Sequence, residues 1–252
     1  MFSFDFQLTT GDQNIGTVYL PNEHATNLPV IIYCHGWGGN RQLSSAAAAM
    51  RNEAMQKNFA FVAFDFYGCG ETGGDYSLMR YGRWKDNFAE IFAWCINQSF
   101  ADKNRIGCYS VSSGTMTALR FAAENHDIAF VISVATAISL VWLAKTLAEH
   151  AAELLAGEKY EFLGTAFGME FFADTVGNSP MYTMTEIACP VLFLQGGDDN
   201  PWRCADARLG YDLMKRKNLP VTHIEIPGGN HGLDNVVDQA TRHTFDWLAT
   251  IL

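Results

Sequence analysis

The residues with the clearest chemical potential lie in a small turn at positions 110–114, which read Ser-Val-Ser-Ser-Gly. Within residues 106–119, an apolar run of strand type precedes this turn and a helix-forming run follows it. A strand that turns sharply into a helix exposes its pivot residue, and small neighbours permit the close backbone approach. Ser112 occupies the pivot, whereas Ser110 falls on the strand and Ser113 on the first helical turn. Ser112 is therefore the candidate nucleophile.

A serine hydroxyl becomes an effective nucleophile when a base takes its proton and a carboxylate orients that base. Both partners are expected after Ser112, each in a loop that follows a strand. The carboxylate pair Asp198 and Asp199 follows the apolar run and glycine turn of residues 190–197. His231 lies in a later Gly-Gly-Asn-His-Gly stretch. Because the carboxyl ends of parallel strands share one edge of a sheet, we expect the three groups to meet there.

Continuous apolar runs predict the strands that position these groups. The runs are 30–34, 59–64, 128–134, 190–195 and 221–226. Helical patterns alternate with them, and such alternation predicts a mostly parallel sheet with helices on both faces. At the start of the chain, alternating Phe2, Phe4, Phe6 and Leu8 predict a half-buried strand, with an antiparallel partner at Ile15–Leu20.

The segment 137–187 interrupts this alternation. Its first part, from Leu140 to Leu155, predicts one helix, and its second part, from Tyr160 to Tyr182, is aromatic and interrupted by glycines without a clear period. A stretch of roughly fifty residues is too long for an ordinary connection between two strands. We therefore expect a small helical or irregular cap inserted after the sixth strand, within a single domain spanning residues 1–252.

Composition narrows the partners and the compartment. The 252 residues carry a formal net charge of −10, which argues against nucleic acid and anionic membranes as partners. Charged residues make up 17% and hydrophobic residues 48%, which favours a large buried sheet plus exposed apolar surface, either a substrate pocket or an oligomer contact. A homodimer is allowed by this composition without being required.

The cysteines and the absence of several sequence motifs indicate the compartment and the lack of a metal or cofactor. The six cysteines have no CxxC pairing and several lie in apolar runs, so we expect buried free thiols in a reducing compartment. Neither a signal peptide nor an 18-residue apolar stretch is present in the sequence, which predicts a cytoplasmic protein without a membrane span. No His or carboxylate cluster has metal-ligand spacing, and the Gly68-Cys69-Gly70 run lacks a phosphate-loop context. We expect no metal and no cofactor.

The order of these motifs resembles that of the α/β-hydrolases, over essentially the whole chain from Val30 onward. The resemblance rests on four loops and on the serine turn. The turn departs from the family pattern because Ser110 stands where the motif has its first glycine. The loops resemble, in order, the HGxGG oxyanion loop at 35–39, the D-x-x-G-x-G-x-S loop at 65–71 with Glu71-Thr72 offset, the acid turn at 196–199 and the histidine loop at 229–232.

The resemblance implies a role for each residue of the site. It makes Ser112 the nucleophile, His231 the general base and Asp199 the orienting acid, since the family's acid stands three residues after Gly196. It also implies an oxyanion hole formed by the backbone N–H groups of Trp37 and Ser113. His35 would hold the oxyanion loop by side-chain to backbone hydrogen bonds.

Within the family, the cap region resembles bacterial cinnamoyl (feruloyl) esterases. The matching stretches are 74–76 and 180–182. The implied reaction is hydrolysis of small aryl, cinnamoyl-type or short acyl esters, with Trp37, Phe171 and Tyr182 as substrate contacts. Ordinary packing of the cap explains its aromatic residues equally well. An acylaminoacyl- or dipeptidyl-type peptidase, a thioesterase and a non-catalytic binding protein of the same fold are the alternatives.

Overall fold

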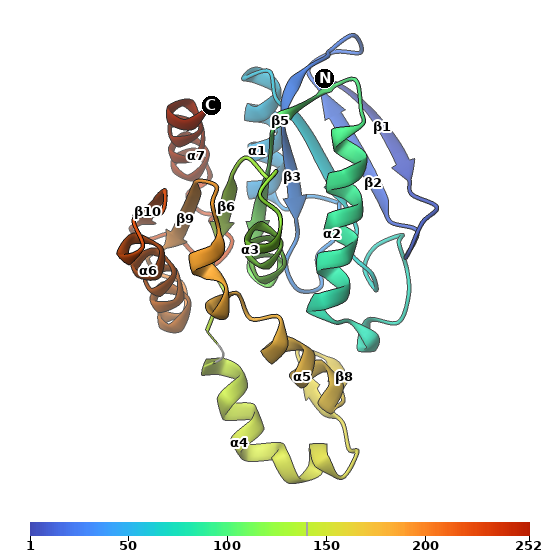
Figure 1. The fold of residues 1–252 in the computed structure, drawn as a ribbon, viewed down its shortest axis with the longest axis vertical. Helices are drawn as coiled ribbons and strands as arrows, with labels where there is room; N and C mark the ends of the chain where they lie inside the picture. Colours follow the sequence, from blue (N-terminus) through green and yellow to red (C-terminus); the bar gives the residue numbers. More distant parts are fainter. Residues whose placement is uncertain (140) are drawn as a thin grey trace.

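An eight-stranded sheet organises the computed structural model, which describes residues 1–139 and 141–252 (Figure 1). The strand order is β1-β2-β4-β3-β5-β6-β9-β10. Its strands are β1 (Phe2–Gln7), β2 (Ile15–Leu20), β3 (Leu28–Cys34), β4 (Ala60–Phe64), β5 (Ala101–Val111), β6 (Val131–Val134), β9 (Val191–Gly196) and β10 (Val221–Ile226). The pairs β1–β2 and β2–β4 are antiparallel, and every pair from β4 to β10 is parallel. The predicted mostly parallel sheet is confirmed.

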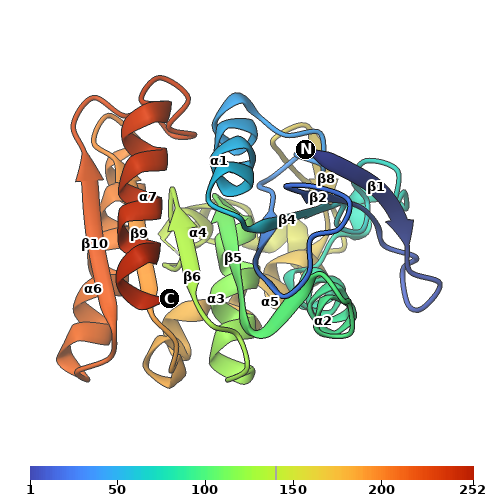
Figure 2. The ribbon, with the colours of Figure 1, turned by 90° about the horizontal axis from the view of Figure 1, so that it is seen from above.

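Helices cover both faces of this sheet (Figure 2). They are α1 (Ser45–Gln56), α2 (Tyr81–Ile96), α3 (Gly114–Glu124), α6 (Pro201–Arg216) and α7 (Val237–Ile251). Side chains of β3 alternate between the two faces, so Ile31 and Tyr33 pack with residues of α1 and α7, whereas Ile32 and Cys34 pack with residues of α2 and α3. A strand covered on both faces is apolar throughout, which explains the continuous apolar runs in the sequence.

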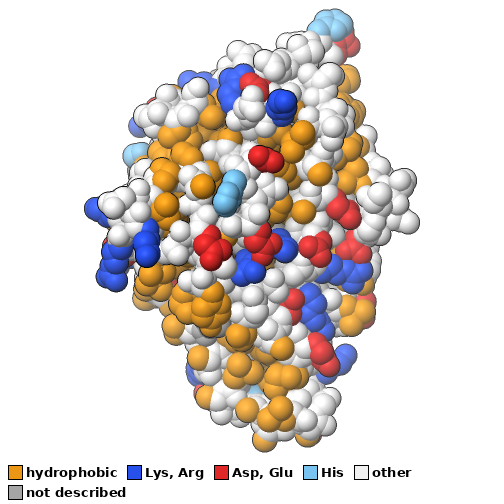
Figure 3. Space-filling view, viewed as in Figure 1, with side chains coloured by type: hydrophobic (Ala, Val, Ile, Leu, Met, Phe, Trp, Pro, Cys, Tyr) orange, Lys and Arg blue, Asp and Glu red, His pale blue; other side chains and the backbone are white. Residues whose placement is uncertain are grey.

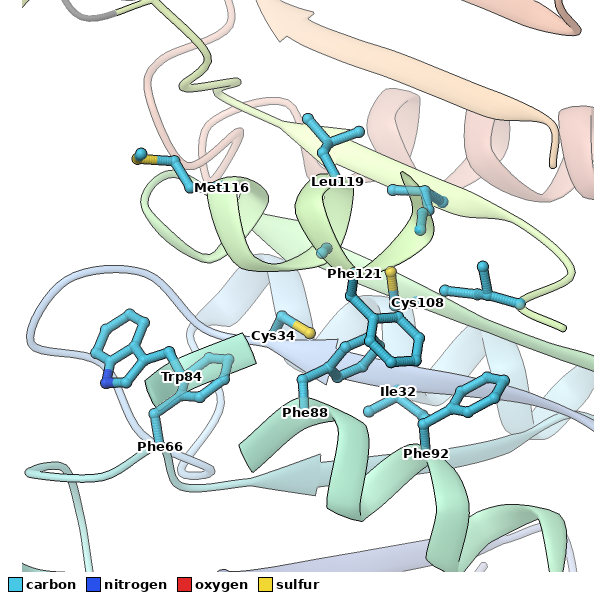
Figure 4. Packing of buried hydrophobic residues seen from close by; sticks show 14 of the residues in the cluster. Ile32, Cys34, Phe66, Trp84, Phe88, Phe92, Cys108, Met116, Leu119 and Phe121 are labelled. Carbon is cyan, nitrogen blue, oxygen red and sulfur yellow. The ribbon is translucent and has the colours of Figure 1, made fainter. Parts of the chain in front are cut away.

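Aromatic side chains, among them Phe66, Trp84, Phe88 and Phe121, pack together in the core on the α2 and α3 face (Figure 4). The Phe66 ring stacks on Trp84 with 4.4 Å between centroids, and Phe88 meets Phe121 edge-on at 4.7 Å. Full burial of a side chain of this size stabilises the fold by about 2–3 kcal/mol. This packing fixes α2 and α3 against β3 and β5. The oxyanion loop follows β3, and the serine turn follows β5.

The first strand is only partly as predicted. β1 forms and pairs with β2, but its Phe2 and Phe4 side chains are exposed. Only Phe6 packs inward, where it stacks on Trp94. The prediction of a half-buried strand is therefore wrong for most of β1. The reason is its position at the outer edge of the sheet, where, among the described residues, Phe6 is the one phenylalanine of the strand in contact with α2, through Trp94.

Between β6 and β9 the chain leaves the sheet as the cap segment, residues 137–187 (Figure 1). It contains α4 (Val141–Leu155), the hairpin β7 (Tyr160–Phe162) and β8 (Thr165–Phe167), α5 (Met169–Gly177) and the single turns η2 (Pro180–Tyr182) and η3 (Met184–Glu186). The backbone of α4 leaves helical geometry at His150. The predicted helix start at Leu140 lies outside the described residues. Three-residue strands are too short to show a period, so the sequence did not predict the hairpin.

Two expectations about composition can be checked on the described residues. All six cysteines are free and buried, as predicted. Hydrophobic side chains gather on the surface over the cap segment, where Val141, Leu155 and Leu163 are exposed (Figure 3). Within residues 1–139 and 141–252, no helix combines the length and the apolar character needed to cross a membrane.

Candidate active site

Ser112 stands at a strained turn between β5 and α3. Its φ of 54° lies in the left-handed region, which costs a residue with a side chain about 1–3 kcal/mol. Neighbouring glycines allow this geometry. A Cβ at Gly114 would lie 2.5 Å from the carbonyl oxygens of Cys34 and His35, and a Cβ at Gly36 would lie 3.1 Å from Ser112 Cβ. The serine turn is thus packed directly on the loop that follows β3.

Three loops at the carboxyl edge of the sheet bring Ser112, His231 and Asp199 together. The His231 Nε2 atom lies 3.0 Å from Ser112 Oγ. Its Nδ1 atom lies 2.9 Å and 3.0 Å from the two carboxylate oxygens of Asp199. The acid and histidine loops also touch, since the Asp198 N–H donates to the Gly229 carbonyl at 2.9 Å. The structure therefore places Asp199 at the histidine, whereas Asp198 is exposed.

Asp199 is held in its ionised form. Its side chain is 3% exposed, and burial alone works against the charge. Hydrogen bonds from His231, from Gln195 Nε2 at 2.9 Å and from the Asn200 N–H at 2.6 Å outweigh burial, so the pKa of Asp199 lies below its ordinary value. An ionised carboxylate only accepts, so His231 Nδ1–H is the donor and Nε2 is left to accept the Ser112 hydroxyl proton.

The two N–H groups predicted as an oxyanion hole border the same cavity as Ser112. They belong to Trp37, in the loop after β3, and to Ser113, directly before α3. Across the described part of the chain, neither N–H has a hydrogen-bond partner. Unpaired backbone N–H groups beside a reactive hydroxyl are suited to hold a developing negative charge.

His35 fixes the oxyanion loop, as predicted. The buried imidazole accepts a hydrogen bond from the Phe66 N–H at Nε2, at 3.2 Å, so its Nδ1–H donates to the Gly36 carbonyl at 2.9 Å. Burial lowers the pKa of His35 to about 4, and the ring is neutral at physiological pH. A second support comes from Tyr76, whose hydroxyl accepts the Gly38 N–H at 3.1 Å.

The loop at 65–71 supports the oxyanion loop from the outside. The carboxylate of Asp65 is fully buried and accepts the Arg41 N–H at 2.6 Å, the Arg41 guanidinium at 2.6 Å and the Glu71 N–H at 2.9 Å. A Cβ at Gly70 would lie 2.3 Å from this carboxylate, so the loop needs glycine there. The glycines of this stretch thus wrap a buried structural aspartate.

The cavity above Ser112 has a volume of about 690 Å³, within the usual range for small-molecule sites. Of the predicted substrate contacts, Trp37 borders it. Phe171 does not, because its ring is buried, stacked on Phe167 and in edge-to-face contact with the Trp37 ring at 5.8 Å between centroids. Tyr182 does not either, because it lies in η2 with 59% of its surface exposed to solvent. Both of these predictions are corrected.

Several cavity residues were missed by sequence reasoning. Among them are Tyr81, Met116, Leu163, Trp202 and Arg203. Two signals were available: Met116 stands about one helical turn beyond Ser112, and Trp202 and Arg203 come shortly after Asp199 in the sequence. Leu163 had no signal, because the hairpin that brings it to the cavity was not predicted. Its neighbour Phe162 also borders the cavity, and it belongs to the aromatic stretch from which pocket residues were expected. No Asp or Glu side chain lines the cavity within the described ranges.

Comparisons with known proteins extend these findings. The sequence profile of the prolyl oligopeptidase family matches residues 45–252. Dipeptidyl aminopeptidase BIII of Pseudoxanthomonas mexicana is 23% identical over 219 residues, which cover 81% of this chain and 30% of that protein. An uncharacterized 31.7 kDa protein of Escherichia coli, from the traX-finO intergenic region, is 28% identical over 105 residues, which cover 42% of this chain and 36% of that protein. The matches therefore span about a third of the length of these relatives.

Solved structures share the fold over nearly the full chain. Est1E from Butyrivibrio proteoclasticus, with ferulic acid bound, superposes with a TM-score of 0.78 at 17% identity, covering 94% of this chain and 96% of that chain. The mouse alpha/beta hydrolase domain-containing protein 10 superposes with a TM-score of 0.77 at 18% identity, covering 99% and 100%. At such identities the likeness concerns the fold alone.

Proposed function

The chain belongs to the prolyl oligopeptidase family and is a hydrolytic enzyme of the α/β-hydrolase fold, and on this premise we propose that it is a serine carboxylic ester hydrolase. Its substrates would be small aryl, cinnamoyl-type or short acyl esters, cleaved through an acyl-enzyme. One observation carries the proposal: a continuous hydrogen-bonded line runs from Asp199 through His231 to Ser112, whose backbone is held in the left-handed region.

In the first half of the proposed reaction, Ser112 Oγ attacks the ester carbonyl while His231 Nε2 takes its proton. Asp199 holds the imidazole in the required tautomer and stabilises the imidazolium that forms. The N–H groups of Trp37 and Ser113 stabilise the oxyanion, and loss of one such donor typically costs about 3 kcal/mol of transition-state stabilisation.

The first half ends when the bond between the carbonyl carbon and the leaving oxygen breaks: His231 gives its proton to the leaving alcohol and the acyl group stays on Ser112. The second half is hydrolysis of this acyl-enzyme. Water then enters, His231 takes a proton from it, and the same oxyanion site stabilises the second tetrahedral intermediate. Collapse of that intermediate releases the acid and restores Ser112. The groups required for both halves stand on the loops after β3, β5, β9 and β10, with no part taken by a metal or cofactor in the proposed scheme.

A fluorophosphonate probe tests the nucleophile. Such probes react with a serine only when a base and an oxyanion site activate it. We expect wild type and Ser110→Ala to be labelled and Ser112→Ala to remain unlabelled, as read by gel fluorescence and by mass spectrometry of the modified peptide. Labelling of Ser112→Ala would mean that another residue is the nucleophile. No labelling of wild type would contradict the assignment and favour a non-catalytic binding protein of this fold.

The main rival is a peptidase, which the family and the similarity to dipeptidyl aminopeptidase BIII favour. A dipeptidyl peptidase has to bind a free amino terminus, for which a carboxylate is the natural partner, and none lines this cavity in the part that the structure describes. For that reason we propose that the enzyme hydrolyses esters. The cap segment forms one wall of the proposed substrate site through Phe162 and Leu163.

A matched substrate panel separates the two. It contains p-nitrophenyl acetate, methyl ferulate, an acyl-CoA thioester and glycyl-prolyl p-nitroanilide. We expect kcat/KM for p-nitrophenyl acetate to exceed that for the anilide by at least about 100-fold. A preference for the anilide supports the peptidase, a preference for acyl-CoA supports a thioesterase, and no turnover of methyl ferulate defeats the cinnamoyl-type assignment.

A further inference from the structure

Arg203 is the one Lys or Arg side chain that borders the cavity among the described residues, beside Ser112 and His231. Its guanidinium makes one long hydrogen bond and one contact with an aromatic ring. Nη1 donates a long hydrogen bond of 3.4 Å to the Ala135 carbonyl, and Cζ lies 4.0 Å from the centre of the Trp202 ring. No ion pair to Arg203 occurs in residues 1–139 and 141–252. Since a guanidinium has five N–H donors, most of its hydrogen-bonding capacity is uncommitted.

The surrounding charges leave this cation only partly compensated. Asp199 and Asp206 are close enough to stabilise it electrostatically. Both are engaged elsewhere, Asp199 with His231 and Asp206 with the N–H groups of Ile138 and Ser139. Burial is the largest influence on Arg203 and lowers its pKa, which means that the guanidinium has lost much of its hydration.

The position of Arg203 in α6 adds to this imbalance. It stands in the first turn of the helix, after Asn200 as the N-cap and Pro201 as the first residue. The positive end of the helix dipole disfavours a cation there, and the first turn contains no acidic residue. The dipole and the guanidinium therefore both create positive potential at the same wall of the cavity. An anion bound in the cavity would be stabilised by both.

We propose that Arg203 forms an anion subsite and that the ester substrates of this enzyme carry a carboxylate. The proposal rests on the proposed esterase function and deepens it. A planar guanidinium matches a carboxylate with two parallel hydrogen bonds, which gives direction as well as affinity. Apart from the glycines and the proposed reacting groups, the remaining wall is apolar or aromatic. Its residues include Tyr81, Met116 and Phe162, and it suits the hydrocarbon part of such an ester.

The same wall disfavours the opposite substrate charge. A free amino terminus would find no carboxylate at the cavity and would be repelled by Arg203. The charge of this subsite thus distinguishes the cavity from one that binds dipeptides through their free amino group. A monoanionic carboxylate, rather than a dianionic phosphate, balances the single positive charge of the guanidinium.

Two pairs of esters test the subsite, one for each side of the scissile bond. On the acyl side the pair is mono-(4-nitrophenyl) glutarate and its neutral methyl ester. On the leaving-group side it is 4-acetoxybenzoate and methyl 4-acetoxybenzoate. We expect kcat/KM for the charged member of at least one pair to exceed that for its neutral partner by about 10- to 100-fold, the strength of a hydrogen bond to a charged group.

Variants assign that preference to a residue. In Arg203→Met the ratio falls to about one, and in Arg203→Lys, which keeps the charge but not the fork, it takes an intermediate value. Arg208→Met is the matched control, because Arg208 stands in the same helix but is exposed and paired with Glu225 at 2.6 Å. It keeps the wild-type ratio. An unchanged ratio in Arg203→Met, or a wild type without preference in either pair, overturns the proposal.

A binding measurement keeps this test separate from catalysis. Calorimetry compares 3-phenylpropionate with 3-phenylpropionamide on wild type and Arg203→Met, and circular dichroism checks that the variant folds. We expect wild type to bind the acid about tenfold more tightly than the amide, and the variant to bind both equally. Equal binding by wild type overturns the subsite even where esters are hydrolysed. Selective binding without Ser112 labelling retains the subsite and overturns the esterase function.

Discussion

The carbonyl oxygen of His35 lies 2.5 Å from the point where a side chain at Gly114 would begin. The end of β3 and the start of α3 are therefore in direct backbone contact. His35 opens the loop that carries Trp37, and Gly114 follows the turn that carries Ser112. Because these two segments are packed without space between them, the nucleophile and the proposed oxyanion site are positioned as one unit.

Replacement of Gly114 by alanine is expected to disrupt this unit. Its Cβ would meet backbone atoms of Cys34 and His35, which cannot rotate away, so the free energy of unfolding should fall by about 3 kcal/mol or more. Urea unfolding measures the loss. Gly177→Ala is the control, since that exposed glycine ends α5 with no atom within 4 Å of the added Cβ, and helix propensity alone should leave the variant as stable as wild type or more so. Equal stability of the two variants would falsify the contact.

The sequence was sufficient for the sheet and the three reacting residues because both depend on local patterns. Continuous apolar runs predict strands covered on both faces, and the small residues around Ser112 predict a sharp turn. Parallel strands then place the loops of Asp199 and His231 at the same edge. The burial of β1 was predicted wrongly because alternation shows which side chains share a face and not whether another layer covers that face.

The residues of the cavity wall could not be predicted from the sequence, for a different reason. Phe171 and Tyr182 are of residue types that often line pockets. In the structure, Phe171 is buried behind the cavity wall and Tyr182 faces solvent. Which aromatic side chain reaches the cavity depends on how the cap segment packs on the sheet. Arg203 was overlooked because an arginine in a helix is ordinarily solvated. Only the structure places it at the cavity, with no ion-pair partner among the residues that the structure describes.

Ser110 is expected to act on stability rather than on turnover. Its buried hydroxyl donates to the Ile132 carbonyl at 2.8 Å, which ties β5 to β6 two residues before Ser112. Ser110→Gly should lower the free energy of unfolding by about 1–2 kcal/mol through the lost hydrogen bond and the added backbone freedom. Turnover of p-nitrophenyl acetate should stay within a few-fold of wild type. A collapse of kcat in a variant that remains folded would reveal a role of this hydroxyl in the reaction.

Asp199→Asn should abolish most of the activity without unfolding the protein. An amide no longer holds the Nδ1–H tautomer of His231, and kcat is expected to fall about 10³- to 10⁴-fold. The neighbouring Asp198→Asn is the control, because Asp198 is exposed and its hydrogen bond to the histidine loop comes from the backbone N–H, which the substitution keeps. Its kcat should change by no more than about twofold. Equal losses in the two variants would mean that the acid is misassigned.

His35 should make the fold sensitive to mild acid. Burial lowers its pKa in the folded state to about 4, whereas a solvated histidine in the unfolded chain has a pKa of about 6.5. Between these values the unfolded chain binds a proton that the folded protein excludes. The stability contribution is therefore fully present above pH 6.5 and is lost as the pH falls toward 4, with a maximal slope of about 1.4 kcal/mol per pH unit.

His35→Gln isolates this contribution, because a glutamine amide can accept the Phe66 N–H and donate a hydrogen bond without titrating. Urea unfolding at several pH values between 7 and 4 measures both proteins. The buried and paired carboxylates, among them Asp199, titrate in the same way in each, so their contributions cancel in the difference. We expect the wild-type curve to fall more steeply than that of the variant across this range. Parallel curves would show that the pKa of His35 is not lowered in the folded protein, against the expectation from its burial.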